Sequence, residues 1–221
     1  MGSSWGAIFD FDGVIVDTEE CHEECWQLVA QEEGLPITHE QYLLGFGVKN
    51  DRFISEILGW TGDPACIARI SKRKELLFQQ IAHKVRLIEG VQPLLESLHT
   101  RGVPCVIASS SILKNIEILL ESLQVGHYFD KIVSGQDVRQ GKPDPEAFLC
   151  AAKKLQLAPG RCVVFEDALF GVEASFRAGC KTIALTTTFP RERFVQLDTP
   201  VDKIIDAFSQ ISVEELDQWF A

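Results

Sequence analysis

The chain changes its hydrophobic pattern at about residue 90. From there onward, short apolar runs alternate with segments whose apolar residues recur every three or four positions. This alternation is typical of buried parallel strands connected by helices that cover both faces of a sheet. The predicted elements are helix 91–101, strand 104–109, helix 112–123, strand 131–133, helix 145–156, strand 162–166, helix 168–178 and strand 181–185.

The first ninety residues combine one strand with several helices. Residues 6–9 form an apolar run that stops at Asp10, which predicts a buried strand with acidic residues at its end. Residues 19–33 are rich in Glu, Gln, Leu and Ala and are followed by a glycine and a proline, which are helix stop signals. Further helical segments are predicted from Gln41, Asp51 and Asp63 to about His83.

These elements predict an α/β fold, with a Rossmann-like doubly wound parallel sheet as the core domain and an inserted all-helical cap domain. The core would comprise residues 1–17 and 88–221, and the cap residues 18–87. Open α/β sheets bind ligands beyond the carboxyl ends of their strands. Polar residues at those ends are therefore the first candidates for a functional site.

Composition narrows the class of protein. The 221 residues are 46% hydrophobic and 24% charged, as in ordinary soluble globular proteins. A net charge of -11 argues against nucleic acids and anionic membranes as partners. The basic run Ser71-Lys72-Arg73-Lys74 is short, and we interpret it mainly as a solvated helix face, with contact to a small phosphorylated substrate as the alternative.

Location and redox state follow from features near the N-terminus and from the cysteines. The N-terminus has no basic region followed by a long apolar stretch, and no segment approaches the roughly 18 apolar residues of a membrane span, so we expect a cytoplasmic protein. Seven cysteines without a C-x-x-C pair predict reduced thiols. Cys21 and Cys25 share a helix face, which favours packing over metal binding. The expected assembly is a monomer or a weak homodimer.

Polar residues follow four of the predicted strands. They are Asp10 and Asp12, Ser109 to Ser111, Lys142, and Glu166 with Asp167. If these groups converge, their carboxylates repel one another unless a cation neutralises them. Oxygen ligands favour a hard ion, which predicts Mg²⁺. Phosphoryl transfer requires the same neutralisation.

Each of these residues has a chemical role that suits its position. A carboxylate such as Asp10 can attack phosphorus directly, and Asp12 can protonate a leaving oxygen and later deprotonate water. The Ser109 hydroxyl and the following backbone N–H groups suit phosphoryl oxygens, while Lys142 supplies positive charge. Taken singly, the same residues are ordinary turn, capping and loop residues.

The order of the motifs indicates a family. The run from Asp10 to Glu19, DFDGVIVDTE, resembles the first motif of the haloacid dehalogenase superfamily. Ser109, Lys142 with Pro143-Asp144-Pro145, and Phe165-Glu166-Asp167-Ala168 resemble its second, third and fourth motifs. The resemblance spans the whole chain. It implies a phosphotransferring enzyme with Asp10 as the nucleophile, and a helical C1 cap that closes over the site.

The resemblance also implies a metal site and a subgroup. Mg²⁺ would be held by Asp10, the backbone carbonyl of Asp12, and Asp167, with Glu166 assisting. The subgroup is that of β-phosphoglucomutase and sugar-phosphate phosphatases. The substrate-binding residues expected from the strand ends and the resemblance are Thr18, His22, Trp26, Lys49, Arg52, Ser110, Ser111 and Asn115.

One departure from that subgroup bears on activity. The mutase has an Arg in the cap loop after a Gly-Val pair, whereas this chain reads Gly47-Val48-Lys49-Asn50. An Asn cannot grip a second phosphate as an Arg does, and Lys49 or Arg52 would replace it only imperfectly. We therefore expect a phosphatase of a small phosphorylated metabolite. The alternatives are a sugar phosphomutase and, more remotely, a non-catalytic binding or regulatory protein.

Overall fold

A single parallel sheet organises the core of the molecule. The computed structural model describes residues 4–221, and within this range the sheet has six strands in the order β5-β4-β1-β6-β7-β8. The strands are β1 (Gly6–Phe9), β4 (Cys105–Ala108), β5 (Lys131–Val133), β6 (Cys162–Glu166), β7 (Lys181–Leu185) and β8 (Lys203–Ile205). The chain builds outward from β1 first on one side and then on the other. The predicted Rossmann-like, doubly wound α/β fold is confirmed.

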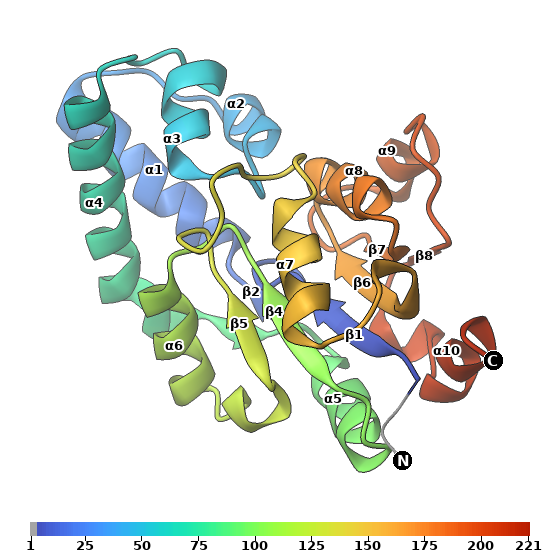
Figure 1. Ribbon diagram of the computed structural model, residues 1–221. Helices are drawn as coiled ribbons and strands as arrows, with labels where there is room; N and C mark the ends of the chain where they lie inside the picture. Colours follow the sequence, from blue (N-terminus) through green and yellow to red (C-terminus); the bar gives the residue numbers. More distant parts are fainter. Residues whose placement is uncertain (1–3) are drawn as a thin grey trace.

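Helices cover both faces of this sheet. On one face lie α5 (Val91–Thr100), α6 (Leu113–Ser122) and α10 (Val213–Trp219), and on the other lie α7 (Glu146–Lys154) and α8 (Leu169–Ala178) (Figure 1). Successive strand residues point to opposite faces. Phe9 therefore joins one hydrophobic cluster and Ile8 the other. Burial on both faces explains why the strands are almost wholly apolar.

A helical segment, here called the cap, separates β1 from the rest of the sheet. It contains α1 (Glu19–Glu33), α2 (His39–Leu44), α3 (Asn50–Arg52), which continues as a π-helical turn (Phe53–Ile57), and α4 (Pro64–Ile81). These helices gather beside the sheet in Figure 1. Where the chain enters and leaves the cap, β2 (Val16–Asp17) pairs with β3 (Arg86–Leu87) in antiparallel fashion. The division into two domains at these points remains a prediction.

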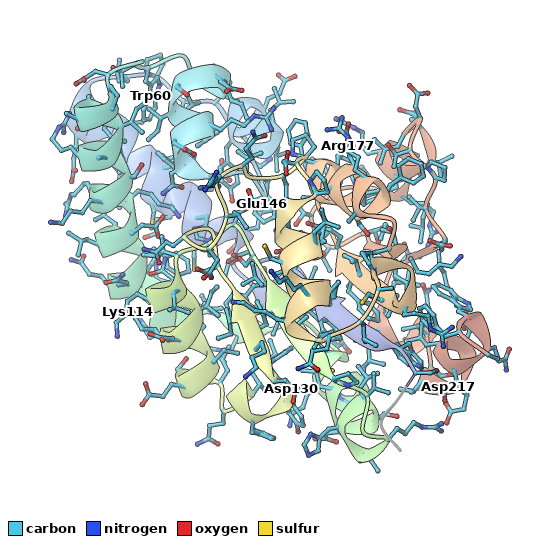
Figure 2. All side chains as sticks on the ribbon, viewed as in Figure 1. Trp60, Lys114, Asp130, Glu146, Arg177 and Asp217 are labelled. Carbon is cyan, nitrogen blue, oxygen red and sulfur yellow. The ribbon has the colours of Figure 1, made fainter. Side chains whose placement is uncertain are left out.

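The cap has a small aromatic core of its own. The ring of Trp26 meets those of Phe53 and Trp60 edge to face. Figure 2 shows Trp60 at the end of the cap remote from the sheet. Cys21 and Cys25 are buried on α1, as predicted for packing residues, and the cysteines are free thiols. None of the helices in residues 4–221 is long and apolar enough to cross a membrane.

Most predicted elements between residues 91 and 185 are confirmed, with ends that agree within two residues. The structure adds α9 (Arg191–Val195), the strand β8 and the small β2–β3 pair, which the pattern did not indicate. These elements are too short to show a period of their own. They form because a neighbouring strand or helix is already in place.

Candidate active site

Three neighbouring strands deliver the site residues to one edge of the sheet. Asp10 follows β1, Ser109 follows β4 and Asp167 follows β6, and β1 lies between the other two. The backbone N–H of Asp10 donates to the carbonyl of Phe165 at 2.9 Å, so the register continues into the site. Parallel strands end at the same edge, which is why residues more than 150 positions apart meet here.

Lys142 reaches this edge from the loop between β5 and α7. Its Nζ lies 2.5 Å from Oε1 of Glu166 and 2.9 Å from Oδ1 of Asp10, although the second contact is too bent for a hydrogen bond. Burial alone would lower the pKa of Lys142, but the charges of Asp10 and Glu166 outweigh it and raise that pKa. The ammonium group is therefore a permanent positive charge beside the candidate nucleophile.

The loop that carries Lys142 is itself fixed. Glu146, at the beginning of α7 (Figure 2), accepts hydrogen bonds from the backbone N–H groups of Arg139 and Gln140. Asp144 in turn accepts from the N–H of Glu146. Such side-chain contacts to backbone donors hold a loop that has no regular structure.

Three buried carboxylates form a cluster suited to a cation. Oxygen atoms of Asp10, Glu166 and Asp167 all lie within 4.8 Å of one another. Burial raises the pKa of Asp10 to about 8, with Glu166 and Asp12 adding to the effect and Lys142 opposing it. Burial, Glu166 and Asp10 likewise raise the pKa of Asp167. Among the described residues, the Oδ1 atoms of Asp10 and Asp167 are buried without a hydrogen-bond partner.

A divalent cation fits this arrangement. Unpartnered buried oxygens and mutual repulsion are both relieved when a metal ion binds to them. Glu166 is less available as a ligand, because its Oε2 accepts the N–H groups of Asp167 and Ala168 and its Oε1 accepts Lys142. The orphaned oxygens of Asp10 and Asp167 are thus the natural protein ligands.

Asp12 lies in a network of donors between core and cap. Its Oδ1 accepts from Thr18 Oγ1 at 2.8 Å and faces His22 Nε2 at 3.1 Å, while its Oδ2 accepts from Ser111 Oγ at 2.6 Å. Burial opposes ionisation, but the His22 contact and the hydroxyl donors outweigh it and lower the pKa of Asp12. Burial and nearby Lys74 lower the pKa of His22. The Asp12 carboxyl group is therefore ionised beside His22.

A cavity of about 340 Å³ lies between these residues and the cap. The sheet edge contributes Asp10, Asp12 and Ser109 to Ser111, and the cap contributes residues from α1, from the loop before α3 and from α4. Of the predicted substrate-binding residues, the cavity is lined by His22, Trp26, Lys49, Ser110 and Ser111. Their role in binding stays a prediction.

The other three predicted residues are engaged elsewhere. Thr18 donates to Asp12, as described, and Arg52 donates to the carbonyl of Lys142 at 3.0 Å. Asn115 does not line the cavity but donates to Glu75, which does. Two further bonds join cap to core, from Ser110 Oγ to the Gly47 carbonyl and from Lys49 Nζ to the Val138 carbonyl.

The sequence analysis did not single out two buried charged residues of the cavity wall. Lys74 and Glu75 of α4 line the cavity, and both are buried. The interpretation of residues 71–74 as a solvated face is therefore wrong for Lys74, although Lys72 is exposed and Arg73 pairs with Glu32 on the surface. Successive helix residues are about 100° apart. One basic run can thus place side chains on both the buried and the exposed face of a helix.

Known proteins share this sequence and fold. The family model for haloacid dehalogenase-like hydrolases matches residues 7–185. A chloroplastic 5-amino-6-(5-phospho-D-ribitylamino)uracil phosphatase of Arabidopsis thaliana is 35% identical over 86% of the chain, which spans about half (52%) of that relative. The fructose-1-phosphate phosphatase YqaB of Escherichia coli is 33% identical over 80% of this chain and 94% of its own length.

A solved structure agrees over nearly the whole chain. It is a family IA, variant 3 hydrolase of Entamoeba histolytica with a TM-score of 0.87 and 26% identity, covering 98% of this chain and 99% of that one. The chain therefore belongs to the haloacid dehalogenase-like hydrolase family, as predicted, and it is an enzyme of the phosphatase type. Enzymes of this family generally use a divalent metal, for which the buried acidic cluster provides a site.

Proposed function

We propose that the protein is a Mg²⁺-dependent phosphohydrolase of a small phosphorylated sugar or related metabolite. One observation carries the proposal: Asp10, Asp12, Lys142 and Asp167 converge at one sheet edge beneath a cavity of small-molecule size. The phosphatases named above act on phosphorylated sugars or ribitylamino compounds. The cavity suits a ligand of that size.

The reaction would proceed in two displacements on Asp10. A carboxylate oxygen of Asp10 attacks phosphorus and the ester P–O bond breaks, giving an aspartyl phosphate. Asp12 takes up the proton of the monoanionic phosphate ester as it binds and passes that proton to the leaving oxygen. Asp12 then takes a proton from water, whose oxygen attacks phosphorus. Phosphate leaves with the proton that Asp12 took up, and the carboxylates of Asp10 and Asp12 are both restored.

The surrounding residues would prepare this chemistry. Lys142 holds positive charge beside Asp10, and the hydroxyl group of Ser109, which lines the cavity, would bind a phosphoryl oxygen. Asp10, Asp167 and the carbonyl of Asp12 would hold the cation, which when bound neutralises the carboxylates and the phosphoryl oxygens. The cap excludes bulk water, and the network around Asp12 keeps that carboxylate ionised, the form in which it accepts a proton.

The phosphomutase alternative is not favoured. Position 50 is Asn, and its amide donates to Glu75 at 2.6 Å instead of facing an open anion site. Arg52 is committed to the Lys142 carbonyl and to Glu56. The non-catalytic alternative is also disfavoured, since the catalytic candidates are all present and assembled.

Phosphate release from a panel of sugar phosphates, nucleotides and other small esters with Mg²⁺ tests the proposal, with β-glucose 1-phosphate isomerisation followed in parallel. We expect Asp10→Asn to abolish release, because an amide cannot form the acyl phosphate. Asp12→Ala should be slower by about 100-fold or more, as for a lost general acid/base. Asp217→Asn, an equivalent change on α10 (Figure 2), is the matched control. Turnover by Asp10→Asn, or isomerisation without release, would contradict the proposal.

A further inference from the structure

The cap side of the cavity contains a buried carboxylate, that of Glu75. Glu75 lies on α4 and lines the cavity, and only 11% of its side-chain surface is exposed to solvent. Its Oε1 accepts from Asn50 Nδ2 at 2.6 Å and from Lys74 Nζ at 3.1 Å, and its Oε2 accepts from Asn115 Nδ2 at 2.5 Å. Three donors from three separate segments therefore hold one carboxylate in place.

One of these donors, Asn115, is itself held by a further residue. The Asn115 carbonyl oxygen accepts from Gln79 Nε2 at 3.0 Å, so both ends of the amide are used. Burial would raise the pKa of Glu75, but Lys74, His22 and the Asn50 hydrogen bond outweigh it and lower that pKa. Glu75 is thus ionised at neutral pH, and because three donors use three of its roughly four lone-pair sites, one site on Oε2 can still accept a hydrogen bond from a ligand.

The cations of the cavity are already engaged. Among the lining residues that the structure describes, Lys49 and Lys74 are the basic side chains. Lys49 Nζ donates to the Val138 carbonyl at 3.2 Å, and Lys74 Nζ pairs with Glu75. Asp51 adds a further acidic group to the lining. A second phosphate on the substrate would therefore have to compete with Glu75 for Lys74 and would lie beside the Glu75 carboxylate.

We propose that Glu75 is a specificity residue that selects substrates whose non-phosphate part carries hydroxyl groups and rejects those with a second phosphate. Hydroxyl groups donate to a fixed carboxylate, whereas a phosphate close to it is repelled and both groups lose solvation. Selection thus uses an attractive and a repulsive element together. The substrate class is polyhydroxylated monophosphates. This inference rests on the proposed phosphatase function.

The test compares fructose 1-phosphate with fructose 1,6-bisphosphate by kcat/KM for phosphate release, in wild type and in Glu75→Gln. We expect wild type to prefer the monophosphate by about tenfold or more, and Glu75→Gln to reduce that preference by about tenfold, equivalent to about 1.4 kcal/mol. Glu24→Gln, which removes an equal charge from the cap surface, should keep the wild-type preference.

p-Nitrophenyl phosphate, which offers neither hydroxyl groups nor a second phosphate, separates the possible failures. Unchanged turnover of this ester by Glu75→Gln shows an intact catalytic centre, and the expected loss of preference then supports the proposal. An unchanged preference in that variant overturns it. If Glu75→Gln does not fold, equal use of both sugar esters by wild type overturns the proposal and a tenfold preference supports it. No release from any ester by wild type would instead refute the phosphatase function itself.

Discussion

Glu166 determines where the Lys142 ammonium group lies. Its side chain is fully buried, with Oε2 accepting the N–H groups of Asp167 and Ala168 at 2.6 and 2.8 Å. The remaining oxygen, Oε1, accepts Lys142 and directs it to Asp10. Removing one partner of a buried charge pair is costly, because the other charge is left uncompensated. At this scale, Glu166 is a positioning residue for Lys142.

Gly171 provides a test of this arrangement. A Cβ at this position of α8 would lie 1.6 Å from Oε1 of Glu166, so Gly171→Ala must displace the carboxylate and Lys142 with it. We expect a loss of about 1–3 kcal/mol in the free energy of unfolding, as for overpacking, and about 100-fold in kcat, as for a misplaced catalytic group. Urea denaturation and phosphate release measure the two effects. Gly160→Ala is the control, because the atom nearest to a Cβ at that position is 3.8 Å away. Full activity in Gly171→Ala would show that the Glu166 side chain need not stay in place.

At the scale of elements, α4 connects the stability of the cap to the cavity. It carries Lys74 and Glu75 on the cavity side, and Phe78, whose ring stacks on His22 with centroids 4.2 Å apart. The helix begins after Asp63, whose side chain accepts from the N–H groups of Ala65 and Cys66. An amphipathic surface helix depends on such end contacts and on the packing of one face.

We expect Asp63→Ala to lower the free energy of unfolding by about 1 kcal/mol, because it removes the N-cap of α4. Asp63→Asn should be close to wild type, since Asn caps a helix about as well as Asp. Urea denaturation of the three proteins measures the difference. Phosphate release should be unchanged in both variants, because the cap residue lies three turns from Glu75. A loss in Asp63→Asn equal to that in Asp63→Ala would assign the effect to charge instead of capping.

At the scale of the whole molecule, the site exists only where core and cap meet. Contacts from Ser110 to Gly47, from Lys49 to Val138 and from Arg52 to Lys142 join the two parts around the cavity. The sheet order supplies the acids from β1 and β6, and the cap supplies the wall that faces them. Charge repulsion among those acids links the stability of the whole molecule to the cation.

We expect Mg²⁺ to raise the melting temperature of the wild-type protein. A ligand at 100 times its Kd adds about 2.7 kcal/mol, and each kcal/mol shifts Tm by about 2–4 °C in a chain of this size. Asp167→Asn should lose this shift, yet it should be no less stable than wild type in EDTA, because the amide removes repulsion with Glu166 and Asp10. Calorimetry with and without Mg²⁺ tests both statements. Asp217→Asn should keep the full shift, and an equal shift in Asp167→Asn would locate the cation elsewhere.

The sequence alone was sufficient to predict the strands and helices of the core and to identify the catalytic candidates. The strands β1, β4 and β6 and the helices between them follow from apolar runs and helical periods, which are local properties. Asp10, Asp12, Ser109, Lys142 and Asp167 could be singled out because they follow strand ends and because their order resembles one family. The parallel sheet then brings them together, since its strands end at one edge.

Only the tertiary structure decided which charged side chains line the cavity. Glu75 is held by Asn50 and Asn115, which are 25 and 40 residues away, and no local pattern in α4 distinguishes it from a solvated acid. For the same reason, the sequence placed Lys74 in a surface run, although its side chain is buried. The strand β8 was not predicted because three residues are too few to show a periodic pattern, and it forms by pairing with β7. Local periodicity determines which elements form, whereas contacts between distant segments determine which polar side chains become buried and face a ligand.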